Sequence, residues 1–342
     1  MFQTELVLFL QSLENDFLNS FFLFWTEVGY SRWTTPLMLV ILFGVSFRAG
    51  FIMMQAMIWN GMTTLFFKDI FSLPRPCDVD VNVKLIGRDV PNVSLFDSMG
   101  AKTFFGRIPQ DVVSALRQNP ISTWGFPSGH TSNATTLGGL LFLVYRKTWV
   151  RLIAVAMVVF IPLSRMYLGR HFLADLLGGY ALGAIFVLIF YVCVFKNDWI
   201  EKNLFNTTIR NPWEWKHILC LFYLVGLPFL LVFIPHINIS VAATFLGLNV
   251  GFLLVWIRGM PEDRGTVIQR LARVVTALGV FFATDFVLKK IIGALCSFEN
   301  ELAGFIRIVL TAVLFLWGTT EVCVKLGFYR RQGSHLKIKD LL

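Results

Sequence analysis

Charged residues are scarce in this sequence, and their scarcity excludes a water-soluble fold. Only 15% of the 342 residues are charged, whereas 56% are hydrophobic, and the mean hydropathy is +0.67. A soluble domain of this length could not cover its surface with so few polar side chains. The sequence therefore predicts an all-α membrane protein, a polytopic bundle of helices.

Cysteine is also rare, and the sequence offers no obvious metal ligands. The five cysteines follow neither a metal-binding spacing nor a paired framework. Three of the five histidines, His217, His236 and His335, have no second ligand at a usable distance along the chain. The net charge of +9 does not call for a nucleic-acid partner, because positive charge in a membrane protein first serves topology.

The hydrophobic residues gather into segments of nearly membrane-spanning length. Residues 1–30 alternate apolar and polar side chains at helical spacing, which predicts an amphipathic helix lying along the interface. A polar, tryptophan-containing stretch at 198–216 marks a linker between a core at 31–197 and C-terminal transmembrane helices at 217–328, which a tail at 329–342 follows. We expect nine crossings, at about 33–47, 50–67, 131–145, 149–164, 173–195, 217–234, 240–257, 271–291 and 302–324.

The core contains one sizeable polar loop, at residues 77–124. Alternation over 77–87 predicts a strand or hairpin, and the pattern of 110–119 predicts a short helix. Two interpretations of this loop remain open, a compact cap over a site and a plain solvated connection. Basic residues concentrate in alternate connections of the nine-span scheme, which places the loop on the outer side and the tail in the cytoplasm.

Three short motifs place cations, histidines and small residues at the ends of apolar runs. They read KDIFSLPRP from residue 68, GFPSGHT from residue 125 and SRMYLGRHFLAD from residue 164. If the chain is helical from Phe172 onwards, His171 and Asp175 share one face. A carboxylate that fixes the imidazole tautomer leaves the other ring nitrogen free to attack. Together the motifs supply what a tetrahedral oxyanion requires, namely three cations, two imidazoles and backbone amides near Ser128 and Gly129.

These motifs resemble those of the type 2 phosphatidic acid phosphatase (PAP2) family, which read K-x6-RP, PSGH and SR-x5-H-x3-D. Every position is present here without substitution, and the resemblance covers roughly residues 15 to 197. It implies that His171 attacks phosphorus, that His130 is the general acid and then the base, and that Asp175 orients His171. It also implies phosphate binding without any metal or other cofactor. The residues expected to bind the phosphate are Lys68, Arg75, Ser128, Gly129 and Arg165.

The family resemblance predicts a phosphatase that acts on a lipid phosphate or lipid diphosphate at the outer leaflet. Undecaprenyl diphosphate, phosphatidate, phosphatidylglycerol phosphate and sphingoid-base phosphates all present the same phosphoryl group, so the motifs do not choose among them. We expect a bacterial inner membrane with the site on the periplasmic or outer side. The alternatives are a soluble sugar phosphate, as in glucose-6-phosphatase, and a non-catalytic lipid binder or transporter.

Several charged residues lie outside the motifs. Asp285 with Lys289, and Glu321 with Lys325, have the spacing of helical ion pairs, and we interpret both as structural. Arg170 is expected to meet lipid phosphate.

Overall fold

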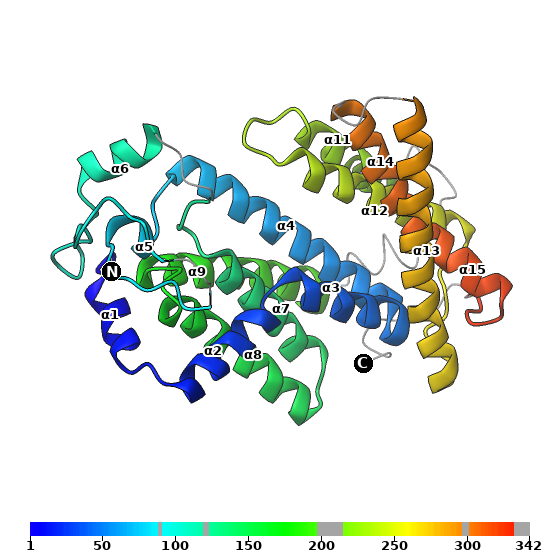
Figure 1. The fold of residues 1–342 in the computed structure, drawn as a ribbon. Coiled ribbons are helices and arrows are strands. Elements are labelled where there is room, and N and C mark those ends of the chain that lie inside the picture. The colour runs from blue at the N-terminus through cyan, green and yellow to red at the C-terminus, as the bar shows by residue number, and fades with distance from the viewer. Residues whose placement is uncertain (88–90, 119–122, 197–214, 296–300, 332–342) are drawn as a thin grey trace. The chain divides into compact units, whose positions relative to one another are not determined.

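The computed structural model describes residues 1–87, 91–118, 123–196, 215–295 and 301–331. Within these ranges every regular element is helical, apart from one isolated bridge between Pro261 and Arg331. The all-α prediction is therefore confirmed. The chain forms two compact units, one of residues 1–34 and 59–190 and the other of residues 35–58 and 191–342 (Figure 1). The boundary between them falls inside helices α3 (Ser31–Leu39) and α4 (Phe47–Phe71).

The first unit is built around α7, which packs against both α8 and α9, while α2 packs along α8 (Figure 1). Phenylalanine and tryptophan side chains make the α2–α8 contact, and the ring centroids of Phe21 and Phe160 are 5.2 Å apart. The packing of these helices brings residues that are far apart in the sequence close together. The helices of the first unit are α1 (Glu5–Ser12), α2 (Asp16–Val28), α5 (Pro76–Val79), α6 (Gln110–Gln118), α7 (Gly129–Val144), α8 (Thr148–Tyr167) and α9 (Leu173–Phe190).

The N-terminal segment is two helices rather than the one that the sequence suggested. Residues 13–15 interrupt it, because Asn15 caps α2 by accepting a hydrogen bond from the backbone N–H of Leu18 at 2.9 Å. An Asn side chain in this position replaces the helical hydrogen bond that the first turn lacks. The segment is thus divided into α1 and α2.

The loop at 77–124 is packed rather than freely solvated. Val79 of α5 and Val112 of α6 are buried together with Phe172, the residue that follows His171. The expected helix at 110–119 is confirmed by α6, but the expected strand over 77–87 is wrong. Pro76 at the first helical position starts α5 there, and the residues after it form turns.

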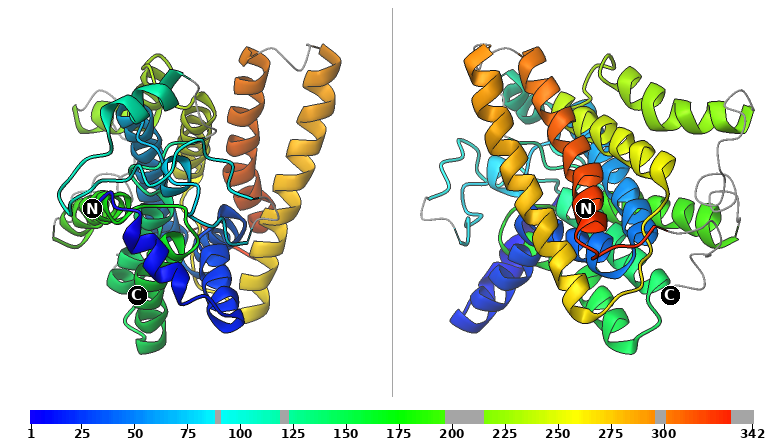
Figure 2. Two further views of the ribbon diagram at one scale, coloured as in Figure 1. Left: turned by 60° about the vertical axis from the view of Figure 1, so that its left-hand side comes forward. Right: turned by 90° about the vertical axis from the view of Figure 1, so that its right-hand side faces the viewer.

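The second unit contains a helical hairpin in which α13 and α14 lie side by side (Figure 2), and α12 packs on α14. At one end of this unit the buried Asp263 carboxylate accepts from Ser46 Oγ at 2.9 Å and from the Phe47 N–H at 2.7 Å. The elements are α10 (Trp215–Leu221), α11 (Leu227–Leu231), α12 (Ile239–Arg258), α13 (Val267–Leu295), α14 (Glu301–Val313) and α15 (Thr319–Lys325), with π-helical turns at Val40–Val45, Tyr191–Lys196, Phe222–Gly226 and Leu314–Gly318.

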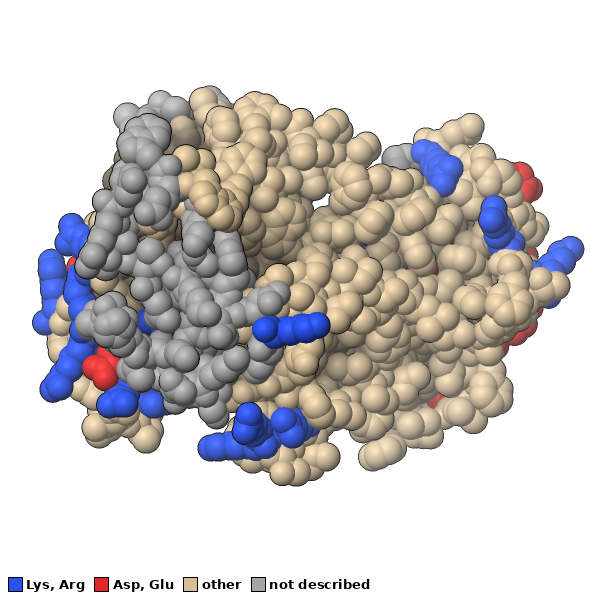
Figure 3. Space-filling view, turned by 180° about the vertical axis from the view of Figure 1, so that it is seen from behind, with Lys and Arg blue, Asp and Glu red and all other residues tan. Residues whose placement is uncertain are grey.

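Among the described residues, five helices are long and apolar enough to cross a membrane, or six if α2 and the segment Ser31–Val45 form one bent span. The chain is therefore a multi-pass integral membrane protein, and Figure 3 shows a broad face with few charged side chains. Three of the nine expected crossings are not among these candidate spans. Helix α7 has only 16 residues, the apolar segment at 217–231 is broken into short helices, and α4 buries polar side chains such as Asn60 and Thr64.

One of the two expected ion pairs is present. Lys289 Nζ lies 3.0 Å from an Asp285 oxygen, and Arg307 of α14 approaches the same carboxylate at 2.6 Å. The second pair was assigned wrongly, because Glu321 binds Arg331 at 2.7 Å instead of Lys325. The chain after α15 turns back, which brings Arg331 to α15.

The linker expected at 198–216 lies almost wholly outside the described residues, as does most of the tail expected at 329–342.

Candidate active site

His171 and Asp175 form the centre of the candidate site. His171 lies just before α9 and Asp175 is in its first turn, so the two residues are one helical turn apart. The distance from His171 Nδ1 to Asp175 Oδ2 is 3.1 Å, and the same oxygen accepts from the Phe172 N–H at 3.0 Å. Both side chains are buried. Because Asp175 engages Nδ1, Nε2 is the ring nitrogen left for chemistry.

The first motif is tied to the second through residues 123–125. Lys68 in the last turn of α4 donates to the backbone carbonyls of Trp124 at 2.6 Å and Gly125 at 3.0 Å. Arg75, which precedes α5, donates from Nε to the Thr123 carbonyl at 3.2 Å. The backbone of 123–125 therefore holds both cations of the first motif in place.

The second motif contacts the third directly. The Ser128 N–H donates to the Asp175 backbone carbonyl at 2.9 Å, and a Cβ on Gly125 would lie only 3.0 Å from Asp175 Oδ2. Ser128 caps α7, since its side chain accepts from the Thr131 N–H at 3.4 Å. The N–H groups of Gly129 and His130 begin the helix and have no intrahelical acceptor, which is the usual character of a helix N-terminus that binds anions.

Two residues outside the three motifs, Thr26 and Tyr30, contact Arg165 and His130. Arg165 is 5% exposed, its Nη1 donates to Thr26 Oγ1 at 2.6 Å, and its Cζ is 5.9 Å from the Tyr30 ring centroid. The Tyr30 ring meets the His130 ring edge-on at 4.7 Å. The spacing of the motifs gave no indication of Thr26 or Tyr30, because both lie in the helix that was expected to follow the interface.

The surroundings of His171 are strongly positive. Burial, followed by the charges of Arg75 and Lys68, lowers the pKa of His171 well below its ordinary value, and Arg165 and His130 act in the same direction. The carboxylate contact does not reverse this shift. The cations of the first and third motifs, together with His130 of the second, thus act on one imidazole. Such a field favours a bound anion and keeps the ring neutral in its absence.

Two buried nitrogens at the site have no hydrogen-bond partner among the described residues. They are Nε2 of His130 and Nε of Arg165. Buried polar atoms are nearly always hydrogen-bonded in proteins, and exceptions often mark functional positions. An anion with several oxygens could accept from both.

Side-chain contacts hold the turn between Arg165, in the last turn of α8, and His171. Gln11 of α1 donates to the backbone carbonyls of Lys84 at 2.9 Å and Tyr167 at 3.1 Å, and its side-chain oxygen accepts from the Lys84 N–H at 3.0 Å. Gly169 has a φ of +73°, and a Cβ there would lie 2.4 Å from the Lys84 carbonyl oxygen, so only glycine fits. The outer loop and α1 therefore brace the turn.

Two residues near the motifs have structural contacts. Ser164 donates to the Ile161 carbonyl at 2.7 Å within its own helix, which leaves its hydroxyl hydrogen engaged there. Arg170, which was expected to meet lipid phosphate, is buried and donates to the Ile86 carbonyl at 3.3 Å. That expectation is therefore wrong, since Arg170 helps to hold the outer loop.

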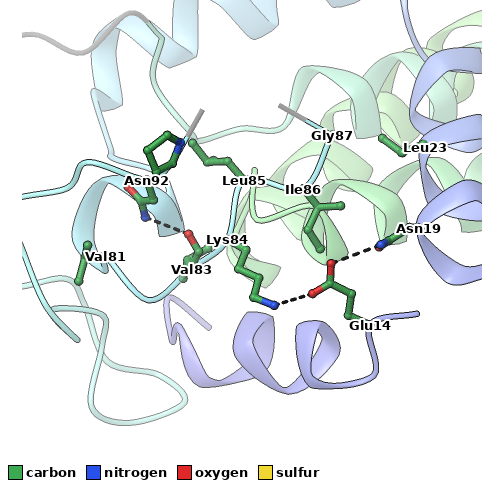
Figure 4. A pocket seen from close by; sticks show the side chains of 11 residues that line it. Glu14, Asn19, Leu23, Val81, Val83, Lys84, Leu85, Ile86, Gly87 and Asn92 are labelled. Atoms are coloured by element: carbon green, nitrogen blue, oxygen red, sulfur yellow. Dashed lines mark hydrogen bonds and ion pairs between the residues drawn. The ribbon is translucent and has the colours of Figure 1, made fainter. Parts of the chain in front are cut away.

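A pocket of about 680 Å³ opens elsewhere in the first unit, between the α1–α2 turn and the outer loop (Figure 4). Lys84 and Glu14 form an ion pair of 2.6 Å across it. None of the candidate site residues lines this pocket. This pocket therefore does not coincide with the candidate site, which the histidine, carboxylate and cations identify.

Comparison with known proteins places the chain in a family. The model described as "PAP2 superfamily" matches residues 49–199, and the model described as "PAP2 superfamily phosphatase, transmembrane extension" matches residues 239–331. The second match covers the part of the chain in which the sequence showed no motif.

Curated relatives each match a limited part of the chain. Phosphatidylglycerophosphatase B of Bacillus subtilis is 33% identical over 27% of this chain and 46% of its own length. Lipid A 4'-phosphatase of Bacteroides thetaiotaomicron is 33% identical over 21% and 32% of the two chains. Dihydrosphingosine 1-phosphate phosphatase of Saccharomyces cerevisiae is 33% identical over 29% and 27%. The chain thus spans less than half of each of these relatives, and it belongs to the PAP2 superfamily of membrane proteins.

Proposed function

We propose that this protein is a membrane phosphatase that removes phosphate from a lipid phosphate or lipid diphosphate through a phosphohistidine. The observation that carries this proposal is the buried contact between His171 and Asp175, on which the cations of the first and third motifs act. A buried, neutral imidazole with one nitrogen fixed by a carboxylate is a prepared nucleophile. The surrounding cations would not stabilise an apolar ligand and would repel a cationic one.

The first half-reaction forms a bond between His171 Nε2 and phosphorus and breaks the bond between phosphorus and the leaving oxygen. His130 gives its proton to that oxygen, so the lipid leaves as an alcohol or, from a diphosphate, as a monophosphate. In the second half-reaction water attacks the phosphohistidine while His130 takes a proton from the water. Inorganic phosphate leaves, and both histidines return to their starting states.

Charge on the transferring phosphoryl group is met by the three cations and the start of α7. The planar guanidinium groups of Arg75 and Arg165 suit two phosphoryl oxygens each, and Lys68 supplies a point charge. The N–H groups of Gly129 and His130 add donors at the positive end of a helix. Donors fixed in advance stabilise the transition state without reorganisation.

Three relatives support a lipid substrate, because their names give a phosphatidylglycerophosphate, lipid A and a phosphorylated sphingoid base. A substrate of this kind keeps its tail in the membrane while its head group reaches the ends of α7 and α9. We place the site on the outer side of a bacterial inner membrane, the side that the alternation of basic residues in the nine-span prediction favours. The test below determines which lipid is the substrate.

The purified protein should release phosphate from phosphatidate, phosphatidylglycerol phosphate, undecaprenyl diphosphate or sphingosine 1-phosphate, and much more slowly from glucose 6-phosphate. Release should continue in excess EDTA and stop with vanadate, which resembles the five-coordinate phosphorus. A competition panel that measures kcat/KM for each substrate decides the order. Preference for the sugar phosphate would favour the glucose-6-phosphatase-like alternative, and activity that needs a divalent ion would contradict the proposed mechanism.

His171 should stay neutral at pH values well below its ordinary pKa of 6.5, and the pH profile of kcat/KM should show this. Protonation would remove the nucleophile, so a lowered pKa extends activity to lower pH. Arg75→Gln removes one of the charges that disfavour protonation, and it should move the acid limb of kcat/KM to higher pH while lowering the maximum. Arg146→Gln, an exposed residue between α7 and α8, is the matched control. A limb that is identical in all three proteins would instead belong to the substrate.

A further inference from the structure

We propose that the end of α2 is a positioning element of the catalytic site, in which Thr26 fixes Arg165 and Tyr30 fixes His130. This inference rests on the proposed function and extends it to a segment that carries none of the motifs. Thr26 in the last turn of α2, and Tyr30 two residues beyond its end, would then hold the transition-state cation and the general acid in register.

The contact to Arg165 is short and buried. Its Nη1 donates to Thr26 Oγ1 at 2.6 Å, and Thr26 is 4% exposed. Of the five N–H donors of Arg165, Nη1 binds Thr26, and the guanidinium also has a side-chain hydrogen bond with Tyr30, while Nε is buried without a partner among the described residues. Thr26 therefore selects one orientation of the guanidinium and leaves the remaining donors for an anion.

The contact to His130 is made by an aromatic ring. The rings of Tyr30 and His130 meet at 90° with centroids 4.7 Å apart, a favourable edge-to-face arrangement. Gly29 completes the fit, because a Cβ at this position would lie 3.0 Å from His130 Cδ2 and 2.9 Å from Ile161 Cγ2. The imidazole is thus held on one side by backbone and on another by an aromatic edge.

The same tyrosine also lies near Arg165, whose Cζ is 5.9 Å from the ring centroid. This distance is within the range of a cation–π interaction. Tyr30 therefore contacts both the proposed acid and the proposed cation. A shift of the end of α2 would move both groups together.

Helix α2 can serve this purpose because its own position is determined independently of the site. Asn15 caps its start, and Phe22 packs against Tyr167 with ring centroids 4.5 Å apart. Trp25 packs against Phe160 at 5.2 Å. These contacts anchor α2 along α8, the helix that carries Arg165, before the chain reaches Thr26 and Tyr30 (Figure 1).

The two roles predict different kinetic signatures. Thr26→Val keeps the shape of the side chain but removes the acceptor, so Arg165 loses its orientation. We expect kcat to fall on the order of 10-fold and inhibition by vanadate to weaken by a similar factor, because small misplacements of such a group are costly. Thr26→Ser, which keeps the hydroxyl, should restore both values.

Tyr30→Leu should act on proton transfer instead. An alkyl phosphate needs a proton on its leaving oxygen, whereas p-nitrophenolate leaves without one. We expect the variant to lose on the order of 10-fold in kcat on the alkyl ester and less than about 2-fold on p-nitrophenyl phosphate, since general acid catalysis matters only for the first. Tyr30→Phe keeps the ring but loses the hydroxyl's hydrogen bond with Arg165, so it should keep the wild-type ratio of the two rates. A merely structural fault would slow both substrates equally.

The experiment separates this inference from the proposed function. Turnover is measured for the four variants and the wild type in detergent, together with the shift in melting temperature that vanadate causes. Weaker vanadate stabilisation of Thr26→Val than of Thr26→Ser supports the orientation of Arg165 even in a protein that proves to have no phosphatase activity. An active wild type whose Thr26→Val and Tyr30→Leu variants match it in vanadate inhibition and in both substrates would overturn the inference alone.

Discussion

Replacing His171 by alanine should reduce phosphate release by at least about 10³-fold, because the residue that forms the covalent bond is removed. The cations would still bind the phosphoryl group, since Lys68 and Arg75 are held by the backbone of 123–125 rather than by His171. Substrate or vanadate binding should therefore survive better than turnover. This separation of binding from chemistry distinguishes a lost nucleophile from a collapsed site.

The covalent intermediate offers a second measurement. A phosphohistidine is stable in alkali and labile in acid, so ³²P-labelled substrate quenched in alkali should leave label on the wild type and none on His171→Ala. His130→Ala should accumulate more label than the wild type when the leaving group is p-nitrophenolate, because attack by water then lacks its base. Full activity of His171→Ala, or label that persists in it, would contradict the proposed mechanism.

A matched control should lie outside the unit that contains the site and tolerate substitution. His236 has a φ of +66°, a conformation that asparagine adopts more readily than most residues. His236→Asn therefore removes a histidine without straining the backbone. It should retain the activity and melting temperature of the wild type.

The local geometry of the site followed from the sequence. Helical spacing predicted that His171 and Asp175 would share one face, and the 3.1 Å contact confirms it. The order of small residues before an apolar run likewise fits Ser128 as the cap of α7. Interactions over four residues or fewer depend on backbone geometry that every helix shares, so helical spacing identified this pair.

Contacts between distant segments did not follow in the same way. Nothing in the residues around Thr26 or Gln11 indicated that their side chains would reach Arg165 and Lys84, because these contacts depend on how α1 and α2 pack. The pairing of Glu321 failed for the same reason, since Arg331 reaches it only after the chain turns back. A helical spacing lists possible partners, but tertiary packing decides which partner is closer.

The membrane spans show a third kind of limit. Hydropathy identified α8 and α9 correctly, yet α4 was taken for an ordinary span although it buries Asn60, which donates to Asn133 at 2.7 Å. A helix that faces other helices can carry polar groups if they are hydrogen-bonded, so its composition no longer reports its surroundings. Helix α7 was also predicted as a span, but its 16 residues are too few for a full membrane crossing.

Asp175→Asn should lower kcat on the order of 10³-fold while the fold persists, because it removes the charge of Asp175 and little of its shape. The amide oxygen can still accept from the Phe172 N–H and from His171 Nδ1, the two contacts that Asp175 Oδ2 makes at 3.0 and 3.1 Å. What it cannot do is balance the positive charge that the imidazole acquires when Nε2 binds phosphorus. The loss should therefore appear in the chemical step rather than in substrate binding.

Asp175→Ala provides the comparison that separates charge from geometry. Alanine also leaves the Phe172 N–H without its acceptor at the start of α9, which should cost about 1–3 kcal/mol of stability and lower the melting temperature. Asp111→Asn, in an exposed position of the first turn of α6, is the control for loss of a carboxylate and should leave kcat unchanged. If Asp175→Asn kept full kcat while Asp175→Ala did not, Asp175 would act by geometry alone, and the charge of the phosphohistidine would have to be balanced by the phosphoryl oxygens themselves.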